Sequence, residues 1–179
     1  MADWTPSSST STGALCDVRS VRHYVEAPPG EKRFKPNFDL FHARSSDCPA
    51  HDQVKSLAYR CRDAGFAIVI VTGKEARWEA LTSAWLAREG IDYDALVTRR
   101  SNDYRPDHVI KAEIALELRA TYNLRLAVDD RQDIIAVWHA ARVPTVQVTQ
   151  AGDLLPLKAP DGGVADARIE AELLPLEER

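Results

Sequence analysis

The sequence predicts an α/β fold in which helices cover both faces of a central parallel sheet. Short apolar segments alternate with amphipathic segments long enough for helices, and this alternation is typical of βαβ units. The clearest strand is Phe66–Val71, a continuous apolar run of the kind that lies buried on both faces of a sheet. Because crossovers between parallel strands are right-handed, we expect a three-layer, Rossmann-like arrangement.

The remaining strands are predicted from shorter apolar runs. Gly13–Val18 is expected to be the first strand, and it brings Asp17 to its carboxyl end. The third, fourth and fifth strands are expected at 95–97, 124–128 and 145–148. Each lies between two helical segments, which fits a sheet built from parallel strands.

The helices are predicted from apolar residues that recur at helical spacing. In the first of them Val54, Leu57 and Cys61 share a face, and Gly65 ends the helix. The expected helices are 52–64, 75–89, 107–122 and 131–142.

The sequence outside the predicted sheet divides into three parts. Residues 1–12 are rich in Ser and Thr and are expected to form a flexible leader to a domain at 13–150. Residues 19–50 lack periodicity and are expected to form a long loop over the fold. Residues 151–179 are expected to be a linker with a short helix at 166–174.

Composition narrows the class of protein. The chain has 179 residues, of which 45% are hydrophobic and 28% charged, as expected for a globular domain without a membrane span. A net charge of −4 argues against non-specific coating of nucleic acid, but not against a small basic pocket. Three cysteines without C-x-x-C spacing favour a reducing, cytoplasmic environment.

Polar side chains follow three of the predicted strands where those strands end. They are Asp17, then Thr72-Gly73-Lys74, then the pair Asp129-Asp130. Because the carboxyl ends of parallel strands meet at one edge, we expect these side chains to converge there. Two adjacent carboxylates repel each other, and Mg²⁺ would relieve that repulsion. The alternative is that Asp130 caps the next helix while Asp129 faces solvent.

Thr72-Gly73-Lys74 does not belong to a phosphate-binding P-loop. That motif needs Gly at position 68 and Ser or Thr at position 75, where this chain has Ile68 and Glu75. The simpler reading is a turn between a strand and a helix.

Lys111 is preceded in the sequence by an arginine-rich segment that contains Arg99, Arg100 and Arg105. One interpretation is that Lys111 faces a phosphate group and the arginines hold further phosphates or a nucleic-acid backbone. The other is a basic face exposed to solvent.

These residues together resemble the haloacid dehalogenase (HAD) superfamily, and more narrowly the phosphatase domain of polynucleotide kinase-phosphatase enzymes from phages and bacteria. The resemblance covers roughly residues 13–150. It is strongest over 93–153, which include the arginine-rich approach to Lys111, the strand-end Asp-Asp-Arg and the helix with Trp138.

The resemblance implies a Mg²⁺-dependent phosphatase, a hydrolase that processes nucleic-acid ends through an aspartyl-phosphate. Asp17 would be the nucleophile, Thr72 would hold the phosphoryl group and Lys111 would neutralise its charge. The metal ligands would be Asp17, Asp129 and Asp130, and the substrate contacts would be Gly73, Arg99, Arg100 and Arg105. The ligand would be a phosphorylated nucleic-acid end or a nucleotide, and a separate kinase or ligase could be a partner.

The sequence departs from the family at the catalytic acid. The family begins with Asp-x-Asp-Gly-Thr, whereas the chain has Arg19 at the second aspartate position counted from Asp17. Arginine cannot exchange a proton at neutral pH. Two hypotheses remain open: a phosphatase in which Asp39, Asp47 or His23 replaces the acid, and a non-catalytic module that binds phosphorylated ends or a partner enzyme.

Overall fold

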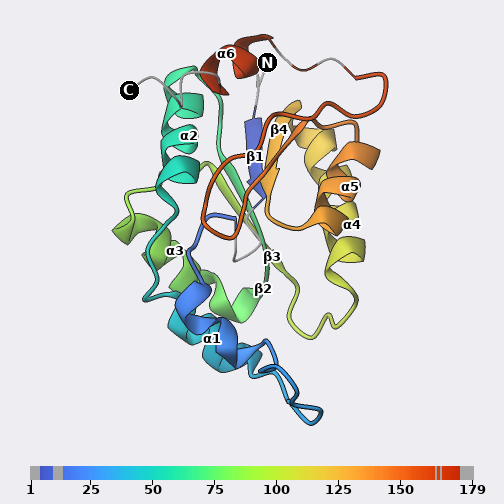
Figure 1. Ribbon diagram of the computed structural model, residues 1–179. Coiled ribbons are helices and arrows are strands. Elements are labelled where there is room, and N and C mark those ends of the chain that lie inside the picture. The colour runs from blue at the N-terminus through green and yellow to red at the C-terminus, as the bar shows by residue number, and fades with distance from the viewer. Residues whose placement is uncertain (1–4, 10–13, 164, 166, 174–179) are drawn as a thin grey trace.

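Five parallel strands form one central sheet in the order β3-β2-β1-β4-β5 (Figure 1). The computed structural model describes residues 5–9, 14–163, 165 and 167–173, and the strand count refers to these. The strands are β1 (Thr5–Ser9), β2 (Val69–Glu75), β3 (Ala95–Arg99), β4 (Leu124–Asp129) and β5 (Thr145–Gln147). The predicted α/β fold with a parallel sheet is therefore confirmed.

Helices cover both faces of the sheet and give the predicted three layers (Figure 1). On one face lie α2 (Asp52–Asp63) and α3 (Glu79–Arg88), and on the other lie α4 (Asp107–Thr121) and α5 (Gln132–Ala140).

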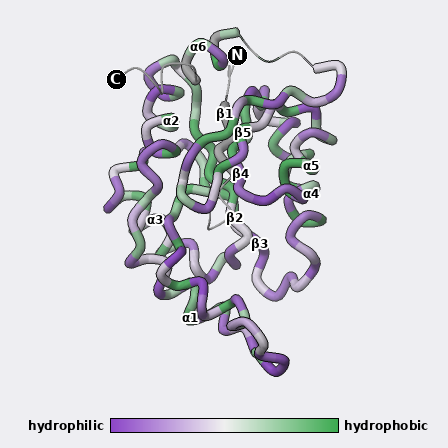
Figure 2. Tube along the Cα trace, in the orientation of Figure 1, coloured by the Kyte–Doolittle hydropathy of each residue, from purple (hydrophilic) through white to green (hydrophobic). Residues whose placement is uncertain are grey.

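Each face of the sheet has its own hydrophobic core. In β2 the side chain of Ile70 packs in the core beside α2 and α3, whereas Val69 and Val71 pack beside α4 and α5. This alternation is the two-residue period of a strand that is buried on both sides. Figure 2 accordingly shows strongly hydrophobic stretches along β2 and β4.

The predicted helices are found with small differences at their ends. The first ends at Asp63, and Gly65 follows with a φ of +85°, a left-handed conformation that glycine adopts without strain. The predicted helix at 75–89 begins instead with a short 3-10 turn, η2 (Ala76–Trp78), because β2 continues to Glu75.

The first strand is not where the sequence predicts it. β1 is Thr5–Ser9, which lay within the expected leader, and it pairs in parallel with both β2 and β4. The prediction of a strand at 13–18 is wrong: Ala14, Leu15 and Cys16 are buried, but as a loop segment that shares only an isolated bridge with residue 50. Burial rather than sheet pairing explains why this segment is apolar.

The segment 19–50, expected to be a long loop, contains two elements that the sequence did not predict. They are the 3-10 helix η1 (Arg19–Tyr24) and the helix α1 (Phe38–Ser45). The Asn37 side chain caps α1 by accepting a hydrogen bond of 2.9 Å from the backbone N–H of Leu40. In Figure 1 these elements lie at the end of the sheet where the parallel strands finish.

The C-terminal helix is confirmed as α6 (Ala167–Leu173). It packs near α2, and Ile169 is buried in the core on that face. None of the helices in the described ranges has the length and apolar character needed to cross a bilayer.

Candidate functional site

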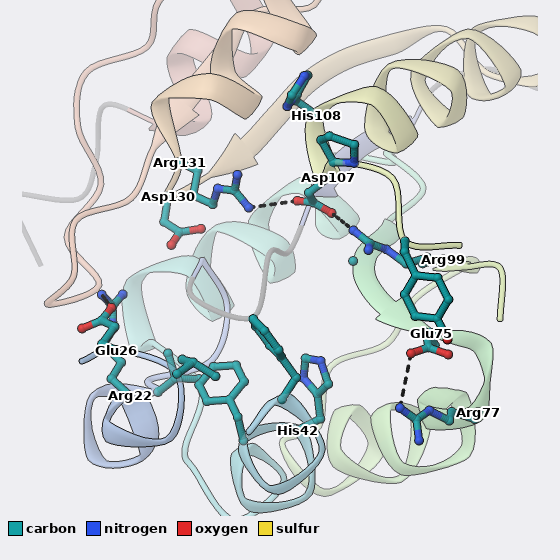
Figure 3. A pocket seen from close by; sticks show the side chains of 17 residues that line it. Arg22, Glu26, His42, Glu75, Arg77, Arg99, Asp107, His108, Asp130 and Arg131 are labelled. Atoms are coloured by element: carbon teal, nitrogen blue, oxygen red, sulfur yellow. Dashed lines mark hydrogen bonds and ion pairs between the residues drawn. The ribbon is translucent and has the colours of Figure 1, made fainter. Parts of the chain in front are cut away.

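A pocket of about 930 Å³ lies at the carboxyl edge of the sheet (Figure 3). One side comes from the sheet edge and the helices that follow it, and includes Gly73, Asp107 and Asp130. The other side comes from η1 and α1 and includes Arg22 and His42. Open α/β sheets bind their ligands at this edge.

The Lys111 ammonium is buried directly behind this pocket. Its side chain is 1% exposed, and Nζ lies 3.0 Å from Oδ2 of Asp129, which is fully buried at the end of β4. It also lies 3.7 Å from Oδ2 of Asp107, one turn earlier in α4. The structure thus brings Lys111 and Asp129 together as the sequence predicts, and it excludes the alternative of an exposed lysine.

Asp107 joins the buried lysine to two arginines of the pocket. Its carboxylate accepts hydrogen bonds from Arg99 at 3.0 Å and from Arg131 at 3.2 Å, drawn as dashed lines in Figure 3. A Cβ atom on Gly73 would lie 2.5 Å from Oδ1 of Asp107, so the close approach of the two residues requires glycine. The result is a cluster of three cations around one carboxylate.

The second carboxylate of the acidic pair has a different environment. Burial and the neighbouring Asp129 raise the pKa of Asp130 from 3.8 to about 6. Its Oδ1 atom is buried, and no hydrogen-bond partner is found for it in the described part of the chain. Asp130 lines the pocket, Asp129 is fully buried, and the N-cap residue of α5 is Arg131. The alternative in which Asp130 caps that helix and Asp129 faces solvent is therefore wrong.

We expect the raised pKa of Asp130 to make its contribution to stability depend on pH. The folded protein holds this proton more tightly than the unfolded chain, so the contribution is complete below pH 3.8 and is lost as pH rises through about 6. Asp130→Asn should therefore gain stability relative to the parent protein above pH 6, and the gain should shrink toward pH 3.8. Urea unfolding across this range measures it, and a constant difference would contradict it.

The hydroxyl of Thr72 is buried beside the pocket. Thr72 is 3% exposed, and its Oγ1 accepts a hydrogen bond of 3.2 Å from the backbone N–H of Lys74. The Lys74 side chain leaves the edge: its Nζ lies 3.1 Å from Oγ of Ser45, and burial lowers its pKa. Neither Thr72 nor Lys74 lines the pocket. Thr72 stays a candidate contact for phosphate, because its hydroxyl is buried next to Gly73, which does line it.

Asp17 does not follow the first strand, because that strand ends at Ser9. Arg19 binds the Asp17 carboxylate with two hydrogen bonds of 2.8 and 2.6 Å, which hold the pKa of Asp17 down at about 2. The Asp17 backbone bonds to Pro49, and neither Asp17 nor Arg19 lines the pocket. Asp17 is therefore not placed at the end of the first strand, whereas Val18, between Asp17 and Arg19, does line the pocket. The roles of Asp17 as nucleophile and metal ligand stay predictions.

The sequence directly after β1 has no carboxylate. It reads Thr10-Ser11-Thr12-Gly13, and these residues lie outside the described ranges. The family pattern Asp-x-Asp-Gly-Thr, placed directly after the strand, falls on positions 10–14 of the sequence. Only Gly13 matches it, and both aspartate positions are threonines.

Two of the predicted substrate-binding arginines lie outside the pocket. Arg99 lines it, but Arg100 and Arg105 do not. Arg105 instead forms ion pairs with Asp103 at 2.7 Å and with Glu113 at 2.6 Å. These pairs fix the loop between β3 and α4.

The described residues do not form the predicted magnesium site. No group of three His, Cys, Asp or Glu side chains in the described ranges is placed to hold a metal ion. Both oxygens of Asp129 are engaged, Oδ2 by Lys111 and Oδ1 by the backbone N–H of Arg131 at 3.1 Å. Since Mg²⁺ in proteins is held by one or two carboxylates together with waters and substrate phosphate, the described residues do not hold the ion by themselves.

We expect Mg²⁺ alone to leave the thermal unfolding midpoint of the protein unchanged. A bound ion would raise it, because any ligand that binds only the folded state stabilises that state. Differential scanning fluorimetry with MgCl₂ or with EDTA measures the effect. A rise in Tm that Asp130→Asn abolishes would show that the acidic pair does hold the metal.

Sequence reasoning missed two members of the cluster. Asp107 lies four residues before Lys111, a helical spacing that predicts an ion pair. Arg131 was visible in the strand-end Asp-Asp-Arg. Arg22 and His42 could not have been found, because η1 and α1 were not predicted.

Several known proteins are similar to this chain. The family model of the polynucleotide kinase PNKP phosphatase domain matches residues 33–153. No curated protein sequence matches. Two solved Pnkp1 chains are similar, one from a Pnkp1/Rnl/Hen1 RNA repair complex (23% identity, TM-score 0.63) and one from a Pnkp1/Rnl/Hen1 complex (25% identity, TM-score 0.62). Each comparison covers 83% of this chain, and the chain spans 45% and 47% of those Pnkp1 chains.

A third structure shares the fold over nearly the whole chain. It is a putative β-phosphoglucomutase from Thermotoga maritima, with 18% identity, a TM-score of 0.51 and coverage of 98% of this chain and 99% of that one. The family match begins at residue 33, so it includes neither β1 nor residues 10–32. Because that match covers more than half of the sequence, the chain belongs to the family of polynucleotide kinase PNKP phosphatase domains within the HAD superfamily.

Proposed function

We propose that this chain binds the phosphorylated 3′ end of a polynucleotide, or a nucleotide, in the pocket at the sheet edge. The observation that carries the proposal is the cluster of Arg99, Lys111 and Arg131 around Asp107. Guanidinium groups match the geometry of phosphate oxygens, and the buried ammonium of Lys111 holds the Asp107 carboxylate from behind. The family of the chain supports a phosphorylated polynucleotide as the ligand.

We further propose that binding does not lead to turnover through an aspartyl-phosphate. Asp17 is bound to Arg19 and does not line the pocket, and the sequence after β1 offers threonines at both aspartate positions. HAD phosphatases generally use Mg²⁺, and the described residues of this chain offer no group of three ligands that would hold it without a substrate phosphate. The non-catalytic module is thus the better supported of the two hypotheses.

We expect the two pocket arginines to determine affinity for the phosphate. Arg99→Ala and Arg131→Ala should each weaken binding of a 3′-phosphorylated oligonucleotide by about 10- to 150-fold, the worth of a hydrogen bond to a charged group. Fluorescence anisotropy measures the affinity, and comparison with the same oligonucleotide ending in a 3′-hydroxyl gives the contribution of the phosphate. Arg119→Ala, in the last turn of α4, is the matched control with the same loss of charge outside the pocket lining.

The competing outcomes are distinct. Equal affinity for phosphate and hydroxyl ends would reject the proposal. Release of phosphate that persists in Asp17→Asn but is lost in Asp130→Asn would identify a phosphatase that uses the carboxyl with the raised pKa. Release that is lost in Asp17→Asn would restore Asp17 as the nucleophile.

We propose a separate kinase or ligase as partner. The similar Pnkp1 chains come from complexes with Rnl and Hen1, and a domain that holds an end without processing it could present that end to another enzyme. The described cysteines Cys16, Cys48 and Cys61 form no disulfide with one another, which suits the reducing cytoplasm that the composition predicts.

A further inference from the structure

The pocket is much larger than a phosphate group requires. Its volume of about 930 Å³ lies in the range of pockets that enclose a whole small-molecule ligand. The cations Arg99 and Arg131 meet at Asp107 on one side of it (Figure 3). A phosphate held there leaves room for the remainder of a nucleotide.

The side of the pocket away from Asp107 is aromatic. Phe38, Phe41 and His42 of α1 line it, and Figure 3 shows His42 across the pocket from Asp107. Burial and the charges of Lys74 and Arg77 lower the pKa of His42 to about 4, so its ring is uncharged at neutral pH. This side therefore offers flat, uncharged rings beside Arg22, whose guanidinium is paired with Glu26 at 2.9 Å.

The two most exposed aromatic rings of the described residues also line this pocket. Phe38 is 58% exposed and Tyr104 is 82% exposed. They come from separate segments, α1 and the loop between β3 and α4. Exposed aromatic rings beside cationic groups are the usual means by which proteins hold unpaired bases.

The loop that carries Tyr104 is fixed before any ligand binds. Arg105 pairs with Asp103 in the loop and with Glu113 of α4, and the Tyr104 hydroxyl bonds to Oδ1 of Asn102 at 3.4 Å. A ring that is already positioned loses little conformational entropy on binding.

We propose that Phe38 and Tyr104 stack the base of the terminal nucleotide whose phosphate lies at the cation cluster. This inference rests on the proposed function and narrows it: the ligand is an unpaired terminal nucleotide of a nucleic-acid strand, and not a small phosphorylated sugar or free phosphate. A terminal base enters the pocket only when it is not stacked in a duplex, so a frayed or single-stranded end should be preferred to a blunt one.

The test compares two single-stranded oligonucleotides that end in the same 3′-phosphorylated sugar, one with its terminal base and one abasic. The base should improve affinity by about 5- to 150-fold, since a stacked base contributes about 1–3 kcal/mol. A fluorescent purine analogue at the terminal position should be quenched on binding.

The double variant Phe38→Ala/Tyr104→Ala should lose both the gain in affinity and the quenching, and it should keep the affinity for the abasic end. The control Leu116→Ala, which removes another exposed apolar side chain, should lose neither effect.

Each result separates the inference from the proposed function. Equal binding of the two oligonucleotides, both tighter than the 3′-hydroxyl form, would overturn base stacking and leave phosphate binding intact. A preference for the base that survives the double variant would also overturn the role of these rings. Failure of either phosphorylated end to bind better than the hydroxyl end would overturn the proposed function itself.

Discussion

Replacing Thr10 and Thr12 together with aspartate is expected to raise Mg²⁺-dependent phosphate release from a 3′-phosphorylated oligonucleotide by at least about 100-fold, since general acid–base assistance alone contributes about 10²–10⁴-fold. β1 lies between β2 and β4, and its last residue, Ser9, pairs with Val71, directly before Thr72. The described end of β1 thus lies at the edge where β2 and β4 carry Thr72 and Asp129. Two added carboxylates would supply the oxygen ligands and the nucleophile of the family pattern.

Two matched variants control this experiment. Arg19→Asp creates the pattern Asp-x-Asp at 17–19, but it should leave phosphate release at background, because Asp17 and Arg19 do not line the pocket. Asp17→Asn in the Thr10→Asp/Thr12→Asp background should not reduce the gain. Activity that appears in Arg19→Asp instead would show that residue 17 does reach the site.

The largest expected loss of stability follows Lys111→Met. The ammonium lies 3.0 Å from the fully buried Asp129, and removing one partner of a buried ion pair typically costs about 3–5 kcal/mol. Urea unfolding monitored by circular dichroism measures the free energy of unfolding. The helix around Lys111 is otherwise compatible with methionine, so the loss reports the charge pair.

The double variant Lys111→Met/Asp129→Asn is the control for this loss. It removes the buried charge that Lys111→Met leaves behind and should recover part of the stability. A loss below about 1 kcal/mol in Lys111→Met would mean that the pair behaves like an exposed one, and that water reaches the cluster.

The sheet edge could be predicted from the sequence because its residues obey local rules. The apolar strand before Asp129 and the helical spacing around Lys111 fix where both side chains lie. Parallel topology then brings Gly73, Arg99 and Asp130 to one edge, although they come from different strands and loops.

The first strand could not be predicted because its residues do not follow these local rules. Thr5-Pro6-Ser7-Ser8-Ser9 has no apolar pattern, and proline disfavours a central strand because it donates no hydrogen bond. The ladder with β4 is indeed irregular between Thr5 and Ser7. Backbone pairing on both sides outweighs the weak local preference, and Asp17 attracted the prediction only because an apolar buried segment precedes it.

The central position of β1 has a practical consequence for anyone who handles this protein. Without Thr5–Ser9 the sheet would consist of two separate halves, β3-β2 and β4-β5, with no backbone ladder between them. Trimming the chain through Ser9 would therefore remove the strand that is hydrogen-bonded to both β2 and β4, so this segment is not dispensable despite its polar sequence.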